Sequence, residues 1–226
     1  MAHEPVPLSF GIIAPLPRRN RVDPFGDLQA RPERGMFTGN RGCLVDEANA
    51  MVRHHQGRLW IICVLSYKGW KSPLDQPRHW TPLFFLDEAV ALAAGHRPCG
   101  LCRRPAYDSY RKGVARALGI EESPTADQLN RMLAAERLAP GRGMERAGDR
   151  LTWHADLASL PDGTVILAEG RPLLVRPNAL YEFGFGGWTY TGPHEDGKVA
   201  VLTPPTSVRA LQNGFSAVLH QSASTR

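Results

Sequence analysis

Four cysteines are the residues of this sequence whose type and spacing could do chemistry. Cys99 and Cys102 are separated by two residues, and Cys43 and Cys63 precede them. A CxxC turn places two thiolates where both sulfurs reach one Zn²⁺ at about 2.3 Å. A redox CxxC pair normally begins a helix after a strand, whereas this pair follows a predicted helix and Gly95. The spacing therefore favours a zinc knuckle over a redox pair or a metal-free packed pair.

A tetrahedral zinc site needs two further ligands. Cys63 lies in a predicted apolar strand over 59–65, and Cys43 follows the glycine-rich segment 35–42. A lone cysteine in an apolar strand is often only a small core residue, so both assignments stay open. Imidazole nitrogen is the other option, and the candidates are His54, His55, His79 and His96. The predicted ligand set for one Zn²⁺ per chain is Cys43, Cys63, Cys99 and Cys102.

The stretch from Phe84 to Arg103 contains FFLDEA, an alanine-rich segment and GHRPCGLCR. It resembles the second half of the Ada-type metal-binding domain, in which paired phenylalanines, an alanine-rich helix and an RPCxxCR segment deliver the last two zinc thiolates. The close match is confined to residues 84–103 and extends loosely back to Trp60. The resemblance implies an Ada-like α+β fold, zinc binding and an association with DNA repair.

Cys63 stands at the end of its predicted strand, where the first cysteine of that family lies. In the family this cysteine accepts a methyl group from a DNA phosphotriester, so the resemblance implies that Cys63 is a methyl acceptor. The family has a second cysteine four residues later, and here that residue is Tyr67. The fourth ligand must therefore be Cys43 or a histidine if the site is complete.

Positive charge is concentrated next to the CxxC turn. The segment 97–116 has six Lys or Arg residues and one Asp, an excess that equals the formal net charge of +5 of the whole chain. Arg97, Arg103 and Arg104 flank the two cysteines and are the predicted contacts to DNA phosphates, with solvated surface arginines as the alternative. The sequence therefore predicts a nucleic acid partner at this segment.

The fold class that these patterns predict is α+β. Helices are expected at 46–55, 86–94, 107–118 and 124–138, and short strands at 164–167, 173–175, 181–183 and 199–202. The segment 35–42 is expected to form a tight turn, although glycines also permit close approach to a phosphate. The expected organisation is a proline-rich extended arm (1–34), an Ada-like metal-binding module (35–118), a helical connector (119–150) and a β-rich C-terminal unit (151–220).

The composition narrows the class of protein. Four cysteines in 226 residues are too few for a disulfide-built secreted domain. No apolar run approaches the roughly 18–20 residues of a membrane-spanning helix, and the N-terminal sequence does not resemble a secretory signal. We therefore expect a cytoplasmic protein without a membrane partner.

Two other classes of function remain open at this stage. One is an enzyme that uses Asn40, Arg41 and the histidines, with the knuckle only stabilising its fold. The other is a non-catalytic interaction module built around the knuckle. In the C-terminal unit, aromatic residues alternate over 181–190 and are expected to pack into the core rather than to stack on unpaired bases.

Overall fold

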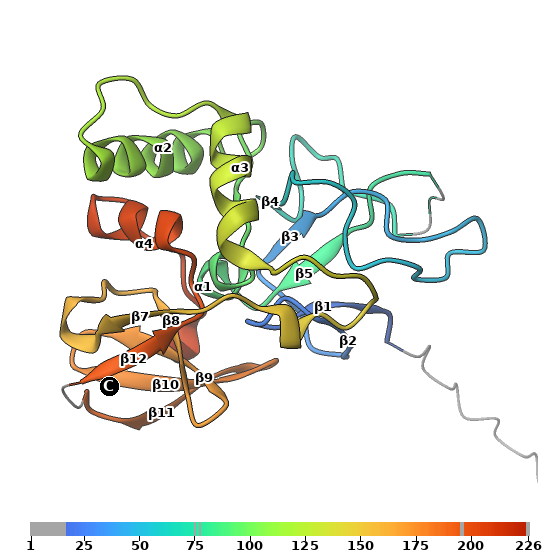
Figure 1. Ribbon diagram of the computed structural model, residues 1–226. Helices are drawn as coiled ribbons and strands as arrows, with labels where there is room; N and C mark the ends of the chain where they lie inside the picture. The colour runs from blue at the N-terminus through green and yellow to red at the C-terminus, as the bar shows by residue number, and fades with distance from the viewer. Residues whose placement is uncertain (1–16, 75, 77, 195–196, 225–226) are drawn as a thin grey trace, which may run out of the picture.

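The computed structural model describes residues 17–74, 76, 78–194 and 197–224. The protein is of the mixed α/β type, with two six-stranded sheets on either side of a central helix, α1 (Figure 1). The first sheet has the strand order β2-β1-β5-β3-β4-β6. Its strands are β1 (Arg19–Val22), β2 (Leu28–Ala30), β3 (Phe37–Asn40), β4 (Ile61–Cys63), β5 (Leu83–Phe85) and β6 (Arg97–Pro98).

The second sheet has the order β11-β10-β9-β8-β12-β7 and is antiparallel throughout. Its strands are β7 (Trp153–Asp156), β8 (Val165–Ala168), β9 (Arg171–Arg176), β10 (Ala179–Gly184), β11 (Gly187–Gly192) and β12 (Lys198–Val201). The four strands expected in this unit are confirmed. Strands β7 and β11 were not expected, because charge and glycine interrupt their apolar patterns.

Four α-helices lie in the described part of the chain: α1 (Glu88–Ala93), α2 (Arg104–Leu118), α3 (Ala126–Arg137) and α4 (Pro205–Gln212). Three 3-10 turns accompany them: η1 (Ala147–Asp149), η2 (Leu157–Ser159) and η3 (Gln221–Ala223). Helix α1 begins at the N-cap Asp87, whose carboxylate accepts the Val90 N–H at 3.0 Å. Helix α3 begins with a capping box between Thr125 and Gln128. The expected helices at 86–94, 107–118 and 124–138 are confirmed, although the last begins at the N-cap Thr125 rather than at Pro124.

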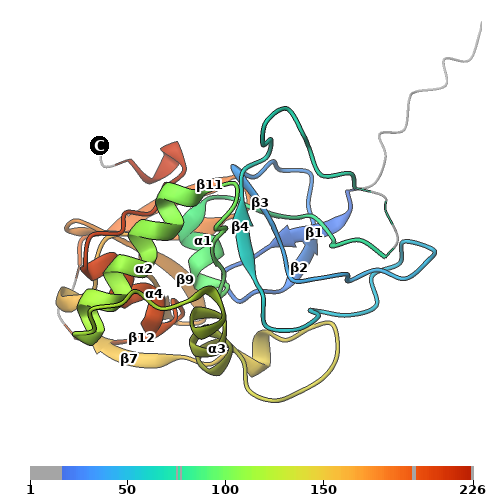
Figure 2. The same cartoon turned by 90° about the horizontal axis from the view of Figure 1, so that it is seen from above.

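Helix α1 is buried on all sides and lies between the two sheets, as the perpendicular view in Figure 2 also shows. One apolar core reaches from Val22 and Phe85 of the first sheet to Val165 and Trp188 of the second. The Trp188 indole Nε1 donates to Asp87 Oδ2 at 2.6 Å, so the second sheet is also hydrogen-bonded to the start of α1. The segment that carries the cysteine turn is therefore anchored from both sides.

Two local expectations are wrong. Residues 37–40 form β3 rather than part of a turn, because Gly39 lets the β3 backbone approach its neighbour: a Cβ there would lie 2.1 Å from the Ile61 carbonyl oxygen. Residues 46–55 form no helix. The Asp46 carboxylate accepts the N–H groups of Ala48 and Ala50, both at 2.9 Å, and this turn competes with helical hydrogen bonding.

The expected N-terminal arm is described only in part. Residues 1–16 lie outside the described residues, and the following stretch contributes β1 and β2 to the first sheet. Within the described part of the chain, no helix combines the length and the apolar character that crossing a membrane requires.

Candidate metal centre

Three cysteine sulfurs meet at one edge of the first sheet. The Sγ atoms of Cys63, Cys99 and Cys102 all lie within 4.8 Å of one another. Strands β4 and β6 are parallel, with Ile62 paired with Pro98, so both strands end at the same edge. Cys63 is the last residue of β4 and Cys99 follows β6 directly, with its N–H bonded to the Ile62 carbonyl at 2.9 Å. This pairing joins two parts of the sequence into one site.

The donor set fits a thiophilic metal ion. Zinc bound tetrahedrally at about 2.3 Å separates its sulfur ligands by about 3.8 Å, which the grouping accommodates. The Leu101 N–H points at Cys99 Sγ at 3.4 Å, as backbone donors do around metal-bound thiolates. Cys99 is buried, while Cys63 and Cys102 are half-buried. The three residues therefore form a sheltered site with access from one side.

Electrostatics within the cluster also favour a cation. Hydrogen bonds from Cys102 and Cys63 lower the pKa of Cys99. Hydrogen bonds to Cys102 and Cys99, together with burial, raise the pKa of Cys63. The three sulfurs thus interact strongly with one another, and a bound divalent metal ion would favour the thiolate form of each.

The fourth predicted ligand, Cys43, is not brought to this group. Its Sγ lies 3.5 Å from the Val45 carbonyl oxygen, and among the described residues the cluster consists of the other three cysteines. His96 is fully buried elsewhere in the core, where its Nε2 accepts the Arg41 Nε–H at 3.2 Å. Three protein ligands with one open position are typical of reactive rather than purely structural zinc sites.

The open side of the cluster is a pocket of about 460 Å³, called here the cysteine pocket. Its wall is mostly apolar, and it includes Leu59, Ile61, Val64, Leu65, Trp70, Trp80 and Leu101. Thr38, Asn40 and Tyr67 are among its polar lining residues. The described lining contains no Asp, Glu or His, so no side chain there can act as a general base toward water. The three sulfurs are therefore its reactive groups.

The three predicted DNA-contacting arginines have different environments. Arg103 is buried and ion-paired with Glu88, with Nη2 to Oε2 at 3.0 Å. Arg97 is buried as well and donates to Asn130 Oδ1 at 2.9 Å. Arg104 is exposed, and its Nε donates to Asp108 at 2.8 Å. Two of the three side chains thus hold the cysteine turn against the body of the protein.

Arg41 and the neighbouring histidines form a buried network of hydrogen bonds. The Arg41 guanidinium donates to the Gly26 carbonyl at 2.7 Å and lies 2.8 Å from His54 Nε2. The Trp60 ring lies 4.1 Å from the guanidinium carbon of Arg41 and 3.7 Å from that of Arg137. Burial and the Arg41 charge lower the pKa of His54 to about 2, so this histidine is neutral. The network bonds mainly to itself and to backbone carbonyls.

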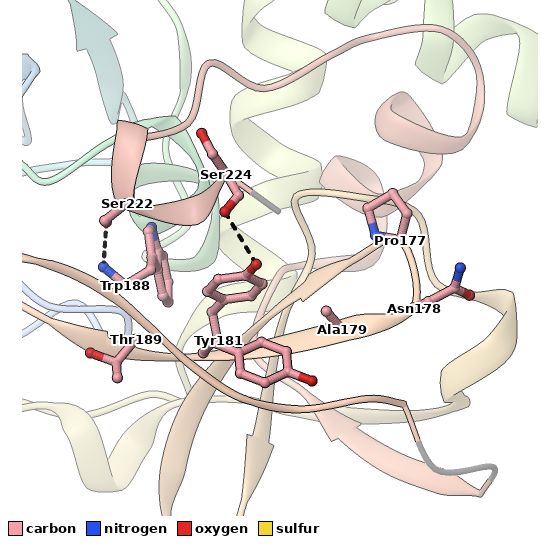
Figure 3. Close-up of a pocket in the computed structure, with 9 residues that line it drawn as sticks. Pro177, Asn178, Ala179, Tyr181, Trp188, Thr189, Ser222 and Ser224 are labelled. Atoms are coloured by element: carbon pink, nitrogen blue, oxygen red, sulfur yellow. Dashed lines mark hydrogen bonds between the residues drawn. The ribbon is translucent and has the colours of Figure 1, made fainter. Parts of the chain in front are cut away.

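A larger pocket of about 770 Å³ lies between β10, β11 and the C-terminal segment (Figure 3). Tyr181 and Trp188 pack into the core as expected, whereas Tyr190, which was expected there too, is 59% exposed. Two of the polar groups drawn there are bonded within the chain: the Tyr181 hydroxyl donates to the Ser224 carbonyl at 3.3 Å, and the Trp188 N–H to Ser222 Oγ at 2.7 Å. With no carboxylate, imidazole or thiol in its described lining, this pocket offers less chemistry than the cysteine pocket.

Sequence reasoning missed two features of the centre. One is Glu88, the partner that buries Arg103; its only trace in the sequence is an acid at the start of an otherwise apolar helix. The other is the wall formed by Trp70 and Trp80, which comes from a loop without a regular pattern.

No family model, curated protein or solved structure matches this chain.

Proposed function

We propose that this protein binds one Zn²⁺ through Cys63, Cys99 and Cys102, and that Cys63 accepts a methyl group from alkylated DNA. The observation that carries the proposal is the convergence of three sulfurs in the lining of an apolar pocket. Bound zinc keeps cysteine sulfurs in the thiolate form at neutral pH. The resemblance of residues 84–103 to the Ada-type domain supports DNA as the methyl donor.

In the proposed reaction the Cys63 sulfur attacks the methyl carbon of a DNA methylphosphotriester. The new S–C bond forms as the C–O bond breaks, and the electron pair of that bond leaves on the phosphate oxygen. The products are S-methylcysteine and an ordinary phosphodiester anion. No proton transfer is needed, which is consistent with a described pocket lining that lacks a general base. Each chain reacts once.

Metal analysis tests the first part of the proposal. Protein purified without chelator should contain about one zinc per chain. Cys63→Ser and Cys99→Ser should each lose most of that zinc, because two sulfurs bind the ion far more weakly than three. Cys43→Ser is the matched control and should keep it, because Cys43 lies outside the cluster. Wild-type protein without zinc, or an equal loss in the control, would contradict the metal site.

Mass spectrometry tests the second part. After incubation with DNA that carries methylphosphotriesters, the peptide containing Cys63 should gain one methyl group. Cys43→Ser protein should be modified to the same extent as wild type. A zinc-loaded protein whose Cys63 stays unmodified would refute the methyl transfer while leaving the metal site intact.

A further inference from the structure

The rim of the cysteine pocket exposes large apolar side chains to solvent. Trp70 is 56% exposed and Leu101 is 70% exposed. Both line the pocket, and the Trp70 ring lies 6.1 Å from that of Trp80, between ring centroids. Exposed apolar groups gathered around a cavity mark a binding surface rather than a packing surface. A partner is therefore expected to cover them.

The neutral polar side chains of the lining can form hydrogen bonds with a flat ligand that carries donors and acceptors. Asn40 belongs to β3 and lies in the lining beside Thr38. Its amide oxygen accepts a long bond of 3.4 Å from the Gly42 N–H. A side-chain amide both donates and accepts hydrogen bonds, as the edge of a nucleobase requires. The volume of about 460 Å³ is within the usual range for small-ligand sites.

Positive charge borders the same aromatic groups. Lys68 follows Tyr67 and Lys71 follows Trp70, and both lysines are exposed. Lys68 Nζ lies 5.6 Å from the centre of the Tyr67 ring. Neither lysine is ion-paired to a carboxylate of the described residues, and the described pocket lining contains no acid. Aromatic rings interleaved with unpaired cations are the usual surface for single-stranded nucleic acid, in which rings stack on bases and cations contact phosphates.

We infer that the cysteine pocket takes an unpaired nucleobase of a DNA strand, stacked on Trp70, with the methylated phosphate on one side of that base toward Cys63 and the phosphates on its other side on Lys68 and Lys71. The inference rests on the proposed action on DNA and adds that the strand is unpaired where it meets the sulfurs. A base inside a duplex cannot enter a pocket of this kind unless it is extruded from the stack. Single-stranded DNA therefore binds more tightly than the same sequence as a duplex.

Fluorescence anisotropy of the zinc-loaded full chain tests this directly. A labelled single-stranded oligonucleotide should bind at least about 10-fold more tightly than its duplex. Trp70→Leu, which keeps an apolar side chain but no stacking face, should weaken single-strand binding about 5- to 100-fold. Trp70→Phe should restore most of it. Tyr190→Ala is the matched control: Tyr190 is 59% exposed but lines the other pocket, so its loss should leave binding unchanged.

Salt dependence separates the role of the lysines from that of the tryptophan. Replacing Lys68 and Lys71 by alanine should lower the slope of log affinity against log salt by about 0.7 for each phosphate that a lysine no longer neutralises. Trp70→Leu should leave that slope unchanged. Equal binding of single strand and duplex, or equal behaviour of Trp70→Leu and Tyr190→Ala, would overturn the inference.

Zinc content and methylation of Cys63 are measured on the same samples. Full zinc content and full methylation without a preference for single-stranded DNA would refute only the inference that the pocket binds an unpaired base. Loss of zinc from the wild-type protein would instead refute the proposed function.

Discussion

Arg103 and Glu88 form a buried ion pair that holds the cysteine turn against helix α1. Two guanidinium nitrogens donate to the two carboxylate oxygens, and the Arg103 and Glu88 side chains are only 7% and 0% exposed. Glu88 Oε2 also accepts the Val218 N–H at 3.0 Å. One carboxylate thus joins the residue after Cys102, the central helix and the C-terminal segment.

Glu88→Gln should therefore destabilise the protein strongly. The change leaves the Arg103 charge buried without its counter-ion, and the expected loss is about 3–5 kcal/mol in the free energy of unfolding. Denaturant titration followed by circular dichroism measures it. Asp108→Asn is the control, because it breaks the exposed pair with Arg104 and should change stability by less than about 1 kcal/mol. Similar losses in the two variants would contradict the structural role given to Glu88.

Gly39→Ala should disturb the metal centre from a distance. The added methyl group would meet the Ile61 carbonyl at 2.1 Å and the Phe85 ring at 2.9 Å, so β3 and β4 must separate. Because β4 ends at Cys63, we expect a stability loss of about 1–3 kcal/mol together with weaker zinc retention under a chelator. Gly148→Ala, where a Cβ meets nothing within 4 Å, should leave both properties unchanged. Normal zinc retention in Gly39→Ala would show that the site does not depend on this strand pairing.

Acid should destabilise the protein through its buried histidines. Burial, followed by the Arg137 charge, lowers the pKa of His55 to about 4, and burial lowers that of His54 to about 2. The unfolded chain, with histidine pKa values near 6.5, binds more protons than the folded chain over this range. The contribution of these neutral histidines to the free energy of unfolding is thus complete above pH 6.5 and is lost as the pH falls toward 4. Asp23 acts in the opposite direction, because burial raises its pKa to about 6.

His55→Gln isolates one share of this pH dependence. Between pH 6.5 and pH 4 the free energy of unfolding of the variant should fall by about 1–2 kcal/mol less than that of the wild type, after allowance for the partial exposure of His55. Urea titrations at several pH values measure the difference. His79→Gln removes an exposed histidine and serves as the comparison. If the two variants show the same pH dependence, His55 does not remain neutral in the folded protein.

The cysteine centre shows which parts of a site can be predicted from sequence. The position of Cys63 at a strand end follows from a local β-branched run, and the turn at Cys99 follows from a capped helix and the Gly95 stop. Such features depend on neighbouring residues only. The mixed α/β character was predictable for the same reason, whereas likeness to the Ada-type fold stays a prediction.

Interactions between distant parts of the chain were not predictable. Cys43 lies outside the cluster, and its N–H bonds to the Gln56 side chain at 2.9 Å, an interaction that no local pattern encodes. Arg103 resembled a surface cation because its partner Glu88 lies in a different element. The parallel pairing of β4 with the two-residue strand β6 is too short to leave a periodic pattern.

The meeting of Cys63 with Cys99 and Cys102 also closes a loop of chain. Between Cys63 and Cys99 lies the part of the chain that carries the Trp70 side of the pocket. A metal ion bound by these sulfurs acts as a cross-link across that loop. A cross-link of this span lowers the entropy of the unfolded chain and so stabilises the folded state by about 3–5 kcal/mol. Chelation would therefore remove this cross-link together with the ion and lower the free energy of unfolding. The three sulfurs, with a metal ion bound, would thus also anchor both ends of the chain segment that forms the Trp70 side of their own pocket.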